Sequence, residues 1–175
     1  SLASPAIRSY VSAFVRDLLE TYPNVTGFRP DWPEYPCYKL PEAFQDFNDH
    51  VALWAQDRDF DFGAIQRDVG RFYEFLHGEL TNRDLEEFAD VERGKWAQMR
   101  LLRQFPNVFE WLRLKRALSM DLLTFWRQTI TEAAGEEKEL SANAFMPPLT
   151  LWTGLDLSGA ADICDAVSPK LYTMH

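Results

Sequence analysis

Three charged side chains follow one another closely in residues 25–36, which read VTGFRPDWPEYP. An arginine close to an aspartate favours the ionised carboxylate, so we expect Arg29 to keep Asp31 charged. Hydrolysis of a glycosidic bond uses such a carboxylate together with a second carboxyl group, and Glu34 is the nearest candidate. We therefore predict Asp31 as a nucleophile or electrostatic stabiliser, Arg29 as its orienting partner and Glu34 as the acid or base. The alternative is a purely structural ion pair between Arg29 and Asp31.

Aromatic side chains accompany these charges. Trp32, Tyr35 and Tyr38 offer flat apolar faces of the kind that pack against sugar rings. We predict Trp32 and Tyr35 as substrate-binding residues. The alternative is that these rings only pack the loop against the helical residues that follow it.

Short β-prone runs bounded by turn residues predict strands at 25–29, at 140–145 and from 166 onward. In a parallel barrel the carboxyl ends of all strands meet on one face, so residues at those ends converge although they are distant in sequence. By this rule Asn143, Tyr172 and His175 join the loop after the first strand. We predict all three as substrate-binding residues.

Helical spacing of apolar residues predicts the elements that position these strands. Ser4 and Pro5 are typical of a helix start, and the helix is expected to end near Tyr22. Further helices are predicted at 41–54, 65–76, 85–103 and 108–131.

Alternation of helix and strand predicts an α/β fold. We interpret residues 1–175 as a segment of one TIM-barrel domain, a partial (β/α)8 barrel with about three parallel strands visible and a large helical insertion at about 40–105. The chain starts without methionine and stops without a helix to cover its last strand, which favours a segment of a larger protein. A complete small three-stranded α/β domain is the alternative.

The composition limits the class of partner. A net charge of -9 argues against nucleic acid and against an anionic membrane surface, both of which need a basic footprint, so a neutral partner such as a carbohydrate fits better. No apolar run approaches the roughly 20 residues that span a bilayer, and no signal peptide is visible. Localisation and oligomeric state stay open.

No metal or cofactor is expected from the residue types. Cys37 and Cys164 are far apart, and neither belongs to a C-x-x-C pair. His50 and His77 have no partner at the spacing of metal ligands. The acidic run QDRDFDFG lacks the glycine and the terminal glutamate of an EF-hand loop.

The run SPAIRSYVSAFVRDLLETYPNVTGFRPDWPEYP resembles a helix and strand of TIM-barrel glycosyl-hydrolase-like proteins. The runs FEWLRLKRALSMDLLTFWRQTI, ELSANAFMPP and DAVSPKLYTMH are similar to the next crossover helix and two strands of that group. The resemblance covers both ends of the chain but not residues 40–105. It implies a glycosidase that acts on O-glycosidic bonds.

Within the same group, GFRPD resembles the Gly-Phe-Arg-x-Asp motif of α-amylase-like barrels. This resemblance implies that Asp31 is the nucleophile and that Arg29 supports it. Glu34 and Tyr35 replace the Lys-His that follows in amylases, and NAFMPP contains no acid glutamate. Two alternatives therefore stay open, a non-catalytic carbohydrate-binding barrel and an interaction module that uses the helical insertion.

Overall fold

The structure is a computed structural model that describes residues 1–135 and 137–170. Its described part contains a small parallel sheet with strand order β1-β2-β3. The strands are β1 (Gly27–Phe28), β2 (Glu139–Ala144) and β3 (Ala166–Pro169). The three predicted strands therefore exist and run in the same direction, although each is short.

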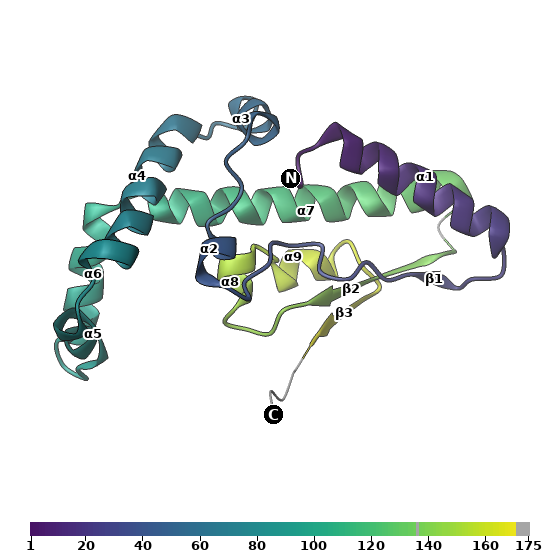
Figure 1. The fold of residues 1–175 in the computed structure, drawn as a ribbon. Helices are drawn as coiled ribbons and strands as arrows, with labels where there is room; N and C mark the ends of the chain where they lie inside the picture. Colours follow the sequence, from purple (N-terminus) through teal and green to yellow (C-terminus); the bar gives the residue numbers. More distant parts are fainter. Residues whose placement is uncertain (136, 171–175) are drawn as a thin grey trace.

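One face of the sheet is covered by α1 (Pro5–Thr21) and α7 (Asn107–Ala134), which lie side by side in Figure 1. The small helix α9 (Leu157–Ala161) lies between β2 and β3 in the chain and completes this layer. Because burial of apolar surface is the main favourable term in folding, these contacts hold the sheet against the helices. The buried side chains of this first core are Val11, Val15, Phe28, Leu123, Ile130, Leu140, Ala142, Ala144, Leu155, Ala160 and Cys164.

A second core lies at the other end of α7. It is formed by α7 with α3 (Asp49–Gln56), α4 (Phe62–Glu74), the π-helical segment η1 (Phe75–Glu79) and α6 (Gly94–Gln104). The short helix α2 (Leu40–Ala43) precedes Phe44, which packs against this core, and α5 (Asn82–Ala89) packs on α6. Its buried side chains are Tyr35, Val51, Ala55, Ile65, Val69, Phe72, Phe105, Val108, Trp111, Leu114 and Leu118. Tyr35 belongs to this core, so the loop after β1 is anchored in the helical part.

Helix α7 has 28 residues and contributes to both cores. No glycine or proline interrupts it, and Pro106 precedes its first residue. It ends at Gly135, whose φ of 79° favours glycine because other residues pay a steric cost there. The sheet and the helical part are therefore tied together by one continuous element, visible along the whole of Figure 1.

The predicted partial (β/α)8 TIM barrel is wrong. The described chain is mostly helical, and its three strands have 2, 6 and 4 residues. Helix and strand signals in a sequence are local, and the same alternation fits any fold in which helices cover a short parallel sheet. Mixed α/β content with parallel strands is confirmed, whereas the barrel is not.

Candidate functional site

The structure brings Asp31 and Asn143 together just past the carboxyl end of β1. The two residues form a parallel β-bridge that extends the pairing of β1 with β2. The Trp32 amide donates to the Asn143 carbonyl over 3.1 Å, and the Asn143 amide donates to the Pro30 carbonyl over 3.2 Å. The backbone therefore fixes both residues at the carboxyl end of the sheet.

The side chain of Asp31 accepts from two donors, one on β2 and one directly after β3. Asn143 Nδ2 donates to Asp31 Oδ1 over 3.2 Å, and the Lys170 ammonium donates to the same oxygen as an ion pair. The hydrogen bond from Lys170, aided by that from Asn143, holds the pKa of Asp31 below its usual value. About 55% of the Asp31 side chain is exposed, so this charged carboxylate can also contact a ligand.

An aromatic cluster adjoins this carboxylate. The Trp32 ring stacks on Phe145 at a centroid distance of 5.0 Å, and Tyr38 packs edge-on against both rings at 5.4 and 5.5 Å. The Lys170 ammonium lies 4.4 Å from the Trp32 ring centroid, which links the cluster to Asp31. Tyr38 is 59% exposed and presents an aromatic surface to solvent.

Glu34, the predicted acid or base, is buried and fully engaged in structural contacts. Its Oε1 accepts from the Phe145 amide over 2.7 Å, and its Oε2 accepts from the Thr153 hydroxyl. Thr153 ends α8 (Thr150–Thr153), so Glu34 joins the β1 loop to the end of β2 and to α8. Burial raises the pKa of this carboxyl group.

The remaining predicted residues are placed as follows. Arg29 is exposed and lines a cavity of about 480 Å³ together with Phe14 and Trp126. Asp31 lines the same cavity, but its ion pair is with Lys170 rather than Arg29.

The ring of Tyr35 is only 2% exposed, which leaves it no face for an external sugar. Tyr172 and His175 lie outside the described residues. Of the predicted substrate-binding residues, the structure therefore groups Trp32 and Asn143 around Asp31.

Lys115 is a residue that the sequence analysis missed. It is fully buried, and its ammonium donates to the Ala43 carbonyl over 2.8 Å. Its Nζ lies 5.0 Å from the Tyr35 ring centroid and 4.7 Å from that of Trp111. Burial lowers its pKa to about 7. Its helical spacing offered a signal, because Lys115 lies one turn from both Trp111 and Leu118 on the buried face of α7.

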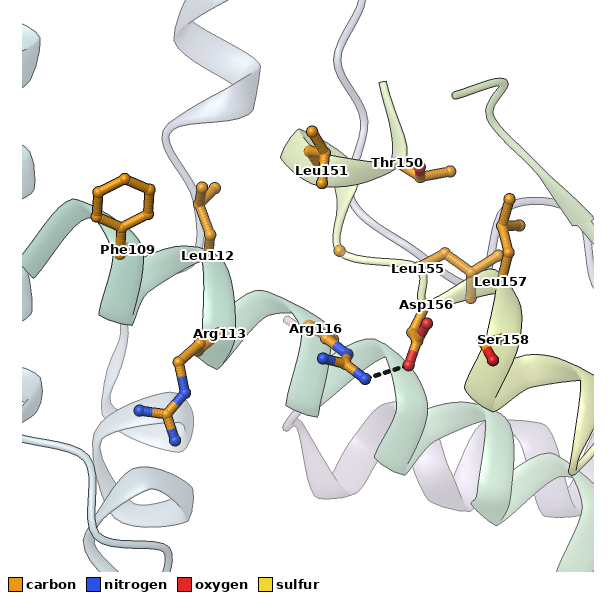
Figure 2. A pocket seen from close by; sticks show the side chains of 11 residues that line it. Phe109, Leu112, Arg113, Arg116, Thr150, Leu151, Leu155, Asp156, Leu157 and Ser158 are labelled. Atoms are coloured by element: carbon orange, nitrogen blue, oxygen red, sulfur yellow. Dashed lines mark hydrogen bonds and ion pairs between the residues drawn. The ribbon is translucent and has the colours of Figure 1, made fainter. Parts of the chain in front are cut away.

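A second cavity of about 480 Å³ lies between α7 and the segment 150–158. Figure 2 shows the guanidinium of Arg116 on α7 directed at Asp156, which precedes α9, and these two groups form an ion pair. Leu112, Leu151 and Leu157 supply apolar walls. None of the predicted site residues lines this cavity, so it is separate from the strand edge.

The described residues contain no group of three or more His, Cys, Asp or Glu side chains placed to hold a metal ion. Within residues 1–135 and 137–170, no helix combines the length and the apolar character needed to cross a bilayer.

Comparison of the chain with protein-family models, curated proteins and solved structures gave no match. The fold and the site define an α/β unit with a charged and aromatic surface at the carboxyl edge of a short parallel sheet. Its function is therefore argued from that surface.

Proposed function

We propose that the carboxyl edge of the sheet binds a carbohydrate, with Asp31 and Asn143 at the centre of the site. The observation that carries this proposal is an exposed carboxylate placed 3.2 Å from an amide on the neighbouring strand. A carboxylate accepts hydrogen bonds, while an amide both donates and accepts them. Neighbouring hydroxyl groups of a sugar offer donors and acceptors in the same combination.

Two neighbours suit the pair to this role. Asp31 is ionised at neutral pH, and the Lys170 ammonium lowers its pKa further, so its carboxylate accepts from hydroxyl groups. The exposed ring of Tyr38 is held by edge-on contacts with Trp32 and Phe145. A supported aromatic ring beside polar groups fits a ligand with one apolar and one polar side, as a sugar ring has.

Binding fits this geometry better than hydrolysis does. A glycosidase needs a second carboxyl group about 5 to 9.5 Å from the first, facing the same substrate. Glu34 is 5% exposed, and both of its oxygens already accept hydrogen bonds from the protein. We therefore place Glu34 in the support of the loop and assign sugar recognition to Asp31 and Asn143.

A binding screen tests the proposal. The labelled chain is applied to an array of neutral oligosaccharides, alongside Asp31→Ala and Asn143→Ala. As a control, Asp17→Ala removes an exposed carboxylate on α1. We expect the wild type and the control to bind the same glycans and both site variants to lose them. Unchanged glycan binding by Asp31→Ala would refute the assignment.

A further inference from the structure

Strand β1 lies at the edge of the sheet in the described residues, with β2 on one side only. The Thr26 carbonyl accepts from Glu139 over 3.0 Å, and the Pro30 carbonyl and Trp32 amide bond to Asn143. These even-numbered residues thus direct their peptide groups toward β2. Pro30 pairs with β2 through its carbonyl alone. Because its peptide groups face β2, its missing N–H removes no donor from the open side of β1.

Peptide groups alternate in direction along a strand, so those of Gly27, Arg29 and Asp31 point to the open side of β1. Among the described residues, no hydrogen bond uses the amide of Arg29 or of Asp31. An edge of this kind is a template for pairing with another strand.

The charged side chains on this edge can pair with those on the same edge of a second copy. Arg29 is exposed and has no ion-pair partner among residues 1–135 and 137–170, and Asp31 carries the opposite charge two positions later. The hydrogen bonds from Asn143 and Lys170 both go to Asp31 Oδ1, which leaves Oδ2 available. If two copies of this edge pair antiparallel about a two-fold axis at Pro30, Arg29 of each copy lies directly opposite Asp31 of the other. Opposite charges at such cross-strand positions attract.

Apolar surface flanks the same edge. A cavity of about 480 Å³ runs beside β1 and includes Phe14, Leu18 and Trp126 in its walls. The neighbouring face of α1 exposes Ile7 and Tyr10, which are 40% and 65% exposed. Contact between two such surfaces would add burial of apolar area to the strand pairing.

We infer that the chain forms a two-fold symmetric dimer in which the two copies of β1 pair antiparallel. Each copy then contributes Arg29 to an ion pair with Asp31 of the other copy, as the isologous contacts of a two-fold interface require. The pairing extends the sheet from edge to edge and leaves Asn143, on β2, outside the interface. The Asp31 carboxylate, which the proposed sugar site also uses, is engaged by Arg29, so the dimer and a sugar compete for it. This inference does not depend on the proposed sugar binding.

Sedimentation velocity of the chain over a range of concentrations tests the dimer. We expect a concentration-dependent dimer for the wild type. Arg29→Asp places two negative charges on the edge and Asp31→Arg two positive charges, so each variant alone should dimerise at least about tenfold more weakly. An equimolar mixture of the two variants should form heterodimers, because their edges are then complementary.

Folding and specificity are controlled separately. Circular dichroism of each variant establishes that it is folded. Phe14→Glu should also weaken the dimer, whereas Val91→Glu, at a 90% exposed position outside this surface, should not. A wild type that stays monomeric at every concentration overturns the inference. So does a dimer that survives Arg29→Asp, or a mixture of folded variants that yields no heterodimer.

Discussion

Asn143 donates a side-chain hydrogen bond to Asp31 over 3.2 Å, although 112 positions separate the two residues in the chain. The parallel pairing of β1 with β2 creates this contact, because it places both residues at one level of the ladder. Most of the helices between them pack in the second core instead. The proposed recognition site therefore rests on strand pairing rather than on that helical packing.

The buried Lys115 should make the stability of the fold depend on pH. Its folded pKa of about 7 is below that of an exposed lysine, so the unfolded chain binds more protons between the two values and stability rises with pH. From about pH 6.5 to 8.5 we expect a gain of about 2 kcal/mol, at ~1.4 kcal/mol per pKa unit.

Urea unfolding of the wild type and of Lys115→Met over this pH range measures that effect. The wild type should gain stability relative to Lys115→Met as the pH rises, since the variant lacks the titrating amine. Parallel pH profiles for the two proteins would mean that Lys115 titrates normally.

Glu34 should contribute to stability rather than to chemistry. Glu34→Ala leaves the Phe145 amide and the Thr153 hydroxyl without their acceptor in a buried place. Each such group costs about 1–3 kcal/mol, so we expect a loss of about 2–4 kcal/mol in the free energy of unfolding. Glu34→Gln, which keeps one acceptor oxygen, should lose less.

Exposed Glu74 on α4 provides the matched control. Glu74→Ala should change the free energy of unfolding by no more than about 0.5 kcal/mol. Equal unfolding free energies for Glu34→Ala and Glu74→Ala would contradict the supporting role of Glu34.

Two glycines should respond to alanine in opposite directions. Gly154 has φ of 93°, and an added Cβ would lie 2.8 Å from the backbone carbonyl of Lys115. Gly70 lies inside helix α4 with nothing within 4 Å of such a Cβ.

Gly154→Ala should therefore destabilise the fold by about 2 kcal/mol or more, through strain and a clash. Gly70→Ala should stabilise it by about 0.5–1 kcal/mol, because alanine is the better helix former. Thermal unfolding measures both, and a stabilising Gly154→Ala would show that the loop does not approach α7 closely.

Local patterns predicted much of the secondary structure. The periodic apolar residues placed α1 and α7 within a few positions, and the β-prone runs located all three strands. Closure of a sheet into a barrel depends on contacts between distant segments, which no local pattern encodes. The barrel prediction failed for that reason.

The sequence predicted only that part of the candidate site in which the ends of the strands determine where the residues lie. The rule that parallel strands deliver their ends to one edge correctly joined Asp31 and Asn143. The rule could not predict that Asp31 forms its ion pair with Lys170 rather than with Arg29, which is nearer in sequence. The partner depends on the directions of the side chains. The rule also could not predict that the side chains of Glu34 and Tyr35 are buried. The burial of this loop depends on helices that follow it in the sequence and pack against it.

The most direct test of the account is a nuclear magnetic resonance titration that observes side-chain amides of the ¹⁵N-labelled chain. The probes are cellotriose, maltotriose, xylotriose and chitotriose, each added up to about 10 mM, which detects a Kd of ~1 mM or tighter. Asn107, whose amide donates to Asp68 over 2.8 Å in the helical part, serves as the internal control. We predict that at least one sugar shifts the side-chain amide resonance of Asn143 and leaves that of Asn107 unchanged. In the Asp31→Ala variant, the same sugar should leave the Asn143 resonance unchanged as well. An Asn143 amide that no sugar shifts would contradict carbohydrate recognition at this edge.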